Sequence, residues 1–173
     1  AYASALRLIT EKNPLPFITG TICAHNCMTK CTRNFYDQPV NIRATKLVAA
    51  EKGYDAYMSK ITPPAPVTDG RKVAVIGGGP TGMSAAYFVG RAGIPVTLFE
   101  KADRLGGIVR QVIPAFRISD EAIDKDVALM EKMGVEVKLN TEAPSVAELK
   151  AQGYTHIFFA VGAWKAGRLD IPG

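Results

Sequence analysis

The sequence predicts an α/β domain, with a parallel sheet built from βαβ units, preceded by a small α-helical domain. After residue 70, short apolar segments alternate with amphipathic helical ones, whereas before residue 65 the pattern is helical or irregular. Strand–helix alternation is the signature of a parallel sheet with right-handed crossovers. Between the two parts, the three prolines of Ile61–Gly70 can continue neither a helix nor a central strand. We therefore expect a domain boundary near residues 65–70.

The first part is predicted to contain two helices around an irregular segment. Residues 1–12 carry an apolar helical stripe, which Asn13-Pro14 ends. Residues 15–38 lack regular periodicity and contain all three cysteines. This pattern is typical of a segment whose conformation is fixed by a bound ligand rather than by a hydrophobic core. Residues 40–52 are predicted to form the second helix, which Gly53 is expected to end.

The second part is predicted to contain four strands with helices between them. The strands are expected at 72–76, 95–100, 135–139 and 155–161, and the helices at 81–92, from Ser119 to Gly134 and at 145–152. The last strand is an apolar run and is expected to be buried. Ser119 is expected to cap its helix, and Asp124 and Asp126 are assigned to the solvent-exposed face of the same helix.

Composition excludes several classes of protein. The chain has 47% hydrophobic and 21% charged residues, so it is not disordered, and no apolar run reaches the roughly 18 residues of a membrane span. The charge of +5 is scattered, and we expect no nucleic-acid partner. Three clustered cysteines do not form a secreted disulfide framework and no signal peptide is visible, which together indicate a cytoplasmic protein.

A glycine motif follows the first predicted strand. Gly77-Gly78-Gly79-Pro80-Thr81-Gly82 has GxGxxG spacing and lies between a strand and a helix, which is the context of a dinucleotide-binding, Rossmann-like domain. The first glycine permits a tight turn, the second lets the backbone approach a pyrophosphate, and the third lets the helix pack on the strand. The phosphates are expected at the helix N-terminus. Glu100, at the end of the next strand, is placed to bind a ribose diol.

The residues after Glu100 favour FAD over NAD(P). Lys101 and Leu105 lead to the pair Gly106-Gly107 and then to Ile108, and such a pair lets a second loop approach the same pyrophosphate. The spacing resembles the FAD-binding domain of flavoproteins with two dinucleotide-binding domains. Phe159-Ala160-Val161-Gly162-Ala163 resembles their second motif, in which a strand returns beneath the flavin. A plain NAD(P)-dependent dehydrogenase domain remains the alternative.

The spacing Cys23-x3-Cys27-x3-Cys31 is the second chemical feature. Structural zinc sites normally add a second cysteine pair or histidines, and the sequence contains no second pair. His25 is interpreted as a surface imidazole rather than a ligand. Thiolate ligation of an iron–sulfur cluster fits the cysteines better. A zinc-stabilised docking module without catalysis, and three free thiols, remain the alternatives.

Several segments, taken in order, resemble one known family. They are Asn13–Cys23, the cysteines, Val40-Asn-Ile-Arg43, the glycine motif, Ile113-Pro-Ala-Phe-Arg-Ile118 and Leu169-Asp-Ile-Pro-Gly173. The combination resembles the N-terminal part of the glutamate synthase small-subunit family of NADPH, FAD and iron–sulfur oxidoreductases. Within it the chain looks most similar to the selenate reductase iron–sulfur subunit branch. Dihydropyrimidine dehydrogenase and NADPH:ferredoxin oxidoreductases share the pattern, which covers essentially the whole chain.

The resemblance implies a helical iron–sulfur domain at 1–65 that binds two [4Fe–4S] clusters. The three cysteines would be cluster ligands, shared between the clusters, and the partner cysteines would lie upstream of Ala1. Many relatives carry a further cysteine at the position of Thr19.

The resemblance also implies an FAD-binding domain at 70–173. FAD contacts are implied from Gly77 to Thr81 and from Glu100 to Ile108, Arg117 would reach the polar groups of the flavin, and the backbone near Ala143 would meet the adenine. NADPH would bind to a domain absent from this chain.

The implied activity is electron transfer by cofactors. A hydride from NADPH would reduce FAD, and single electrons would pass to the clusters and then to a partner active site. That site would belong to further domains of the same polypeptide or to a catalytic partner subunit. No catalytic acid or base is expected in this chain, which alone is expected to be inactive.

Overall fold

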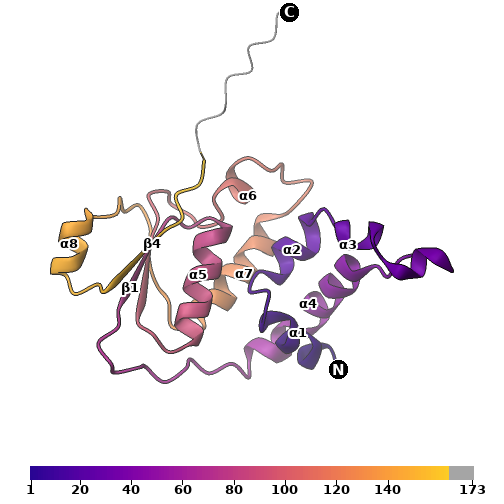
Figure 1. Ribbon diagram of the computed structural model, residues 1–173, viewed down its shortest axis with the longest axis horizontal. Helices are drawn as coiled ribbons and strands as arrows, with labels where there is room; N and C mark the ends of the chain where they lie inside the picture. The colour runs from indigo at the N-terminus through magenta and orange to yellow at the C-terminus, as the bar shows by residue number, and fades with distance from the viewer. Residues whose placement is uncertain (164–173) are drawn as a thin grey trace, which may run out of the picture.

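The computed structural model describes residues 1–163, in which a group of N-terminal helices lies beside an α/β unit (Figure 1). The segment Leu169–Gly173, and with it the end of the expected second domain, lies outside the described residues. Among the described residues, no helix has both the length and the apolar character needed to cross a membrane.

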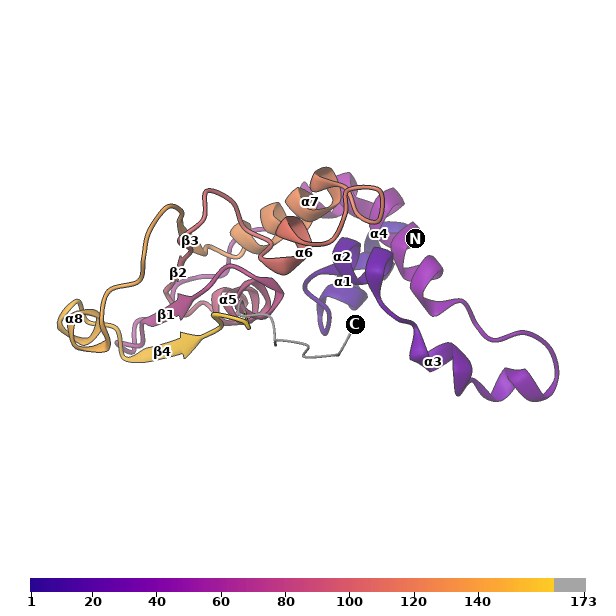
Figure 2. The ribbon, with the colours of Figure 1, turned by 90° about the horizontal axis from the view of Figure 1, so that it is seen from above.

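The N-terminal part is helical. Its elements are α1 (Tyr2–Thr10), α2 (Pro16–Ile22), α3 (Asn26–Thr29), the 3-10 helix η1 (Thr32–Phe35) and α4 (Ile42–Met58). Helices α1 and α2 pack against α4 around a small core of Leu6, Phe17 and Ala50. The segment from α3 to the start of α4 projects away from this core (Figure 2), and the side chains of Phe35 and Tyr36 on it are exposed.

Two expectations for this part were wrong. Residues 15–38 are not irregular throughout, because they contain α2 and the short turns α3 and η1. Helix α4 does not end at Gly53 but continues to Met58. A Cβ atom on Gly53 would lie 2.7 Å from the backbone carbonyl group of Tyr2, so this glycine lets α1 and α4 approach closely.

The α/β unit has the predicted architecture. Strands β1 (Val73–Ile76), β2 (Val96–Phe99), β3 (Glu136–Lys138) and β4 (His156–Phe159) form one parallel sheet in the order β3-β2-β1-β4. The helices between them are α5 (Pro80–Arg91), α6 (Ile108–Gln111), α7 (Asp120–Glu131) and α8 (Val146–Ala151). The side chain of Ser119 caps α7 as expected, because it accepts a hydrogen bond from the Ala122 N–H at 3.2 Å.

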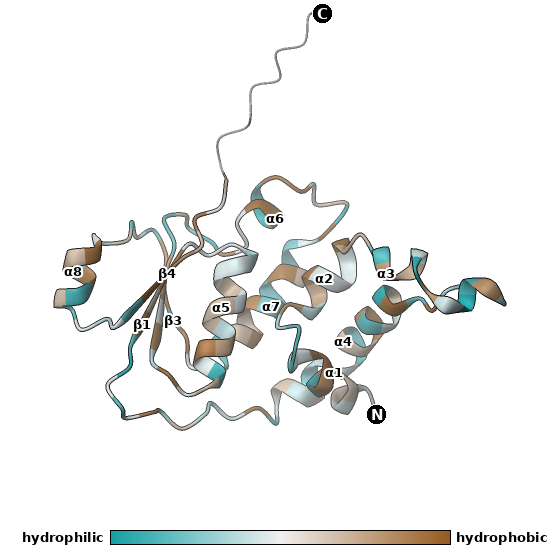
Figure 3. Cartoon of the chain, viewed as in Figure 1, coloured by the Kyte–Doolittle hydropathy of each residue, from teal (hydrophilic) through white to brown (hydrophobic). Residues whose placement is uncertain are grey.

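The two faces of the sheet are covered by different helices. Val73 and Val75 of β1 belong to a core cluster with side chains of α5 and α7, whereas Ala74 packs on the other face with Leu149 of α8. The strands consist mainly of hydrophobic residues (Figure 3). Strand β4 was expected to be buried, but within the described residues it pairs only with β1, and Phe159 is 60% exposed. Its apolar run is therefore an edge strand.

The two parts share a core. Leu15 and Ile18, from the N-terminal part, belong to the same buried cluster as the side chains of the sheet and α7. Residues 59–72, which link the two parts, contain no helix or strand, consistent with the prolines there. Asp124 is exposed as expected, but Asp126 is completely buried, so its assignment to the solvent-exposed face of α7 was wrong.

Candidate functional site

The glycine motif forms the turn between β1 and α5. Gly77 has a φ of +105°, and a Cβ atom on it would collide with the carbonyl oxygen of Ala160. A Cβ atom on Gly82 would collide with the carbonyl oxygen of Gly77. These two glycines are therefore required by the packing of the chain itself, as the motif predicts for its first and third positions.

Gly79 is different, because the packing of the chain does not require a glycine there. Its φ is −76°, and the nearest atom to a Cβ atom built on it would be the Cα of Gly107, at 3.9 Å. The missing side chain leaves a hollow beside the first turn of the 12-residue helix α5. The N–H groups of that turn and the helix dipole favour an anion. The hollow therefore fits the pyrophosphate of a dinucleotide.

The second glycine loop packs directly on the first. The Gly106 N–H donates to the carbonyl oxygen of Gly78 at 2.8 Å, and a Cβ atom on Gly107 would lie 2.8 Å from the Cα of Gly79. Gly106 and Gly107 have φ angles of +120° and +52°, which favour glycine. The structure thus brings the two predicted loops together at one point.

Glu100 joins the first glycine loop to the end of β2. One carboxylate oxygen accepts a hydrogen bond from the Gly78 N–H at 2.6 Å, and the other accepts one from the Ala102 N–H at 2.8 Å. A carboxylate has about four acceptor positions, so both oxygens keep the capacity to accept from a ribose hydroxyl. Sequence reasoning assigned Glu100 to the ribose alone and missed this structural role.

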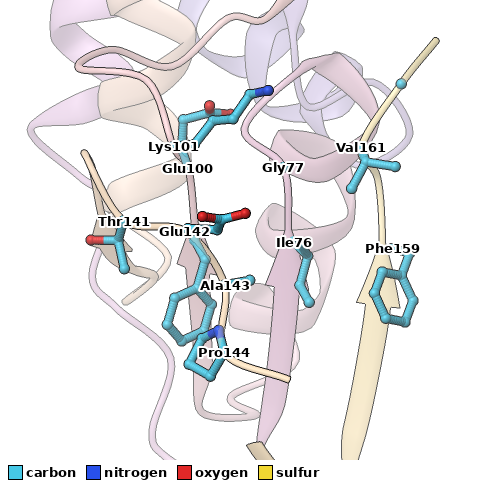
Figure 4. A pocket seen from close by; sticks show the side chains of 12 residues that line it. Ile76, Gly77, Glu100, Lys101, Thr141, Glu142, Ala143, Pro144, Phe159 and Val161 are labelled. Carbon is cyan, nitrogen blue, oxygen red and sulfur yellow. The ribbon is translucent and has the colours of Figure 1, made fainter. Parts of the chain in front are cut away.

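Two cavities open at the carboxyl edge of the sheet, on either side of the glycine turn. The first, of about 450 Å³, lies between residues 141–144 on one side and Phe159 and Val161 on the other (Figure 4). The second, of about 540 Å³, extends along α6 past Ile108 and Val112. Gly77, Glu100, Val161 and Gly162 line both cavities. The cavities together form an elongated site with the glycine turn at its middle, a shape that suits an extended dinucleotide.

The predicted site residues fall into three groups. Those that line one or both cavities are Gly77, Gly78, Gly79, Pro80, Thr81, Glu100, Lys101, Gly107, Ile108, Ala143, Ala160 and Gly162. Gly82, Leu105 and Gly106 line neither cavity and pack inside the loops, where Leu105 is only 4% exposed. Arg117 is exposed on the loop after α6 and lines neither cavity.

Sequence reasoning missed Thr141, Glu142 and Pro144, which line the first cavity. The Thr141 N–H donates to the carbonyl oxygen of Glu100 at 2.9 Å, which holds the loop after β3 against the end of β2. The signal that could have found them is topological, because ligands bind at the carboxyl ends of neighbouring parallel strands.

The cysteines lie between the end of α2 and the start of η1, and we call this stretch, residues 23–31, the cysteine segment. Cys23 follows α2, Cys27 lies in α3 and Cys31 precedes η1; the thiols of Cys23 and Cys27 are exposed. Backbone N–H groups of Val40 and Arg33 lower the pKa of the Cys31 thiol. Three thiols are the donor set that iron–sulfur clusters use. Among residues 1–163, however, no three His, Cys, Asp or Glu side chains are gathered so as to hold a metal ion.

Two other residues near the cysteines have partners. The ring Nδ1 of His25 lies 3.3 Å from the carbonyl oxygen of Cys23, two residues earlier in the chain. The Thr19 hydroxyl accepts hydrogen bonds from Asn13 and from the ammonium of Lys46, at 2.8 and 2.9 Å. Thr19 is therefore part of a polar network between α2 and α4.

Two family models match different parts of the chain. Residues 1–57 match the family model of dihydropyrimidine dehydrogenase domain II, 4Fe-4S cluster, and residues 75–114 match the NAD(P)-binding Rossmann-like domain. Over 99% of the chain, it is 43% identical to YgfK of Escherichia coli, which is named as an oxidoreductase, and 32% identical to the glutamate synthase [NADPH] small chain of Mycobacterium tuberculosis. The chain spans 17% and 36% of the lengths of these relatives.

A solved structure is also similar. 2-Naphthoyl-CoA reductase matches 66% of the chain, and 17% of its own length, with 34% identity and a TM-score of 0.52. The resemblance to the glutamate synthase small-subunit family is thus confirmed. The chain is homologous to a segment of these oxidoreductases, with a domain of the 4Fe-4S type followed by an NAD(P)-binding Rossmann-like domain.

Proposed function

We propose that this chain is the electron-transfer segment of an NADPH-dependent oxidoreductase, with FAD at the glycine loops and [4Fe–4S] clusters at the cysteines. In this proposal residues 1–65 form the cluster domain and the unit from residue 70 onward binds FAD. The hollow at Gly79 carries the proposal, because the packing of the chain does not explain the missing side chain. Bound FAD supplies the capacity to accept a hydride and release single electrons.

Residues of this chain would bind and orient the dinucleotide. The first turn of α5, beginning at Pro80, would face the pyrophosphate, and Glu100 would accept hydrogen bonds from the ribose. The cavity beside Ala143 would take the adenosine, and Ile108 and Val112 would line the apolar wall beside the ring system. FAD is favoured over NAD(P) because a second glycine loop, at Gly107, closes on the first. Arg117 stays a prediction based on the resemblance.

The cysteine segment would hold the clusters together with donors beyond the described residues. Relatives named as the NADPH-Fe(3+) oxidoreductase subunit beta and the NADP(+)-dependent formate dehydrogenase subunit beta support this proposal, since both names describe subunits of NADP-linked oxidoreductases. By analogy with them, the electrons would leave for an active site on further domains or on a partner subunit.

The test is the Gly79→Val substitution in the full-length protein. The valine side chain would fill the hollow, so we expect the purified variant to lose FAD while keeping its fold. Ala92→Val, at the exposed far end of α5, is the matched control and should retain FAD. Bound NAD(P) without flavin in the wild-type protein would favour the dehydrogenase alternative. Zinc without iron at the cysteines would favour the docking module.

A further inference from the structure

The buried carboxylate of Asp126 joins the two parts of the molecule. Asp126 lies on α7 of the α/β unit and is 0% exposed. Its two oxygens accept hydrogen bonds from the backbone N–H groups of Phe17 and Ile18, at 3.1 and 2.8 Å. These N–H groups belong to the first turn of α2, where no preceding turn supplies an acceptor. Asp126 therefore supplies, from 108 residues away, the cap that α2 lacks in its own sequence.

The charged groups around Asp126 come from α4 and α7. Lys46 of α4 favours the ionised carboxylate, and Tyr54 of α4 faces the same region. The ammonium of Lys125, on α7, lies over the rings of Phe17 and Tyr54, 5.4 and 5.9 Å from their centroids. Burial raises the pKa of Asp126 to about 7, despite the two N–H donors and Lys46. Burying an ionisable side chain costs free energy of folding, so packing alone does not account for an aspartate at this position.

The N-terminal half of α7 holds the second glycine loop. The guanidinium of Arg110 pairs with Asp120 and Asp124 of α7, and its Nε donates to the carbonyl oxygen of Leu105 at 2.6 Å. A Cβ atom on Gly106 would lie 3.2 Å from the side chain of Ile123, also on α7. One helix thus supports the glycine loop with its first turns and α2 with Asp126.

At its other end, α2 leads to the cysteine segment. The Cys23 N–H donates to the Thr19 carbonyl oxygen at 3.3 Å, so Cys23 continues directly from the last turn of α2. Arg43 of α4 donates to the Cys23 carbonyl oxygen at 3.0 Å. The path from the glycine loop to Cys23 therefore consists of α7, the Asp126 contact and the seven-residue helix α2.

We infer that Asp126 is a positioning residue that fixes the cysteine segment relative to the second glycine loop. The inference rests on the proposed function, in which electrons pass between the cofactors at these two places. The rate of electron transfer falls steeply with distance, so a rigid connection has a direct effect on function, as supporting residues have at other sites.

The first test is hydrogen exchange of residues 15–23 in the full-length protein. Asp126→Ala leaves the Phe17 and Ile18 N–H groups buried without this acceptor, and we expect exchange there to be roughly tenfold faster or more. Glu131→Gln, at the exposed last position of the same helix, is the matched control and should exchange like the wild type. Unchanged exchange in Asp126→Ala would overturn the inference.

The pH dependence separates positioning by this carboxylate from simple packing. Asp126→Asn keeps an acceptor oxygen but cannot ionise. In the wild type, protection of residues 15–23 should fall as pH rises through 7, because opening α2 releases a proton from a carboxyl whose pKa was raised. The Asn variant should show a flat profile, with residues 80–91 of α5 as the internal reference. Equal profiles in the two proteins would contradict the raised pKa of Asp126 and leave the exchange of Asp126→Ala to decide the positioning role.

The functional readout compares two electron-transfer steps by stopped-flow absorbance in the holoprotein. Asp126→Ala should leave flavin reduction by NADPH unchanged and slow the transfer from flavin to the clusters severalfold. If both steps slow equally and flavin is lost, the residue is merely structural and the inference is wrong. If the wild type contains no flavin, the proposed function fails, while the exchange experiment still tests the contact at Asp126.

Discussion

The glycine loops and the cysteine segment differ in how far the chain itself fixes their geometry. At the glycine loops, a side chain on Gly77, Gly82 or Gly107 would collide with neighbouring backbone, and Glu100 accepts hydrogen bonds from the N–H groups of Gly78 and Ala102. In the cysteine segment, the thiols of Cys23 and Cys27 are exposed. A site built by internal packing can exist before its ligand binds. A site of exposed donors depends on its ligand and on whatever else completes it.

The largest expected effect is at Gly82. Gly82→Ala places a Cβ atom in the space that the Gly77 carbonyl oxygen occupies. The backbone must move to relieve this collision. We expect the full-length protein to lose about 3 kcal/mol of stability and to lose its nucleotide. Gly79→Ala, three residues earlier, has room for the methyl group and should cost less than about 1 kcal/mol. Urea unfolding measures both, and equal losses would contradict the distinction between the two glycines.

Asp126 should make stability depend on pH. Because its folded pKa is raised from 3.8 to about 7, the stability it contributes is fully present below pH 3.8 and is lost as pH rises through 7. We expect the free energy of unfolding of the wild type, relative to Asp126→Asn, to fall by roughly 1 kcal/mol per pH unit between pH 5 and 7. Urea titrations of both proteins at several pH values measure this difference. A pH-independent difference would show that Asp126 is ionised throughout.

A smaller effect is expected at the cap of α8, beside the first cavity. The Ser145 hydroxyl accepts from the Glu148 N–H at 3.3 Å, and the Glu148 carboxylate accepts from the Ser145 N–H at 2.8 Å. The Ser145 hydroxyl also donates to this carboxylate at 2.7 Å, so Ser145→Ala removes two hydrogen bonds and should cost about 1 kcal/mol in urea unfolding. Val146→Ala, at a partly exposed position next to the cap, should cost less. A larger loss in the control would contradict the capping role.

The smallest effect on stability is expected in the cysteine segment. Replacing Cys23, Cys27 and Cys31 together by Ser should change the stability of the cofactor-free protein by less than about 0.5 kcal/mol, because their side chains pack little. The same variant should lose its iron. A large loss of stability without cofactor would mean that the thiols, and not a ligand, organise this segment.

Local sequence signals predicted the α/β unit well. The strands, the cap at Ser119 and the GxGxxG turn each depend on residues close together in the chain, and all were found. Helix α2 has one local signal, Pro16 in its first turn, but its cap and the burial of Asp126 depend on each other across 108 residues. Gly53 was misread as a helix end because its partner is the backbone of α1. The exposed β4 was misread because an apolar run has the same sequence at an edge as inside a sheet.

Part of the candidate site could also be expected from the sequence. The glycines and Glu100 line the cavities where the motif spacing led us to expect a site, because the turn between β1 and α5 has little conformational choice. Ala143, which also lines a cavity, was expected only from the family resemblance. The other lining residues of this loop, Thr141, Glu142 and Pro144, could be recognised only after the strand order was known. No spacing rule could show how the three cysteines would be arranged.

The most direct test of the central claim is cofactor analysis of the full-length protein purified without oxygen. FAD, iron and acid-labile sulfide should be measured in the wild type, in Gly79→Val and in the triple cysteine-to-serine variant. We predict that the wild type contains FAD and iron, that Gly79→Val loses FAD but keeps iron, and that the cysteine variant loses iron but keeps FAD. Loss of both cofactors in either variant, or a wild type with neither, would contradict the assignment of two separate sites.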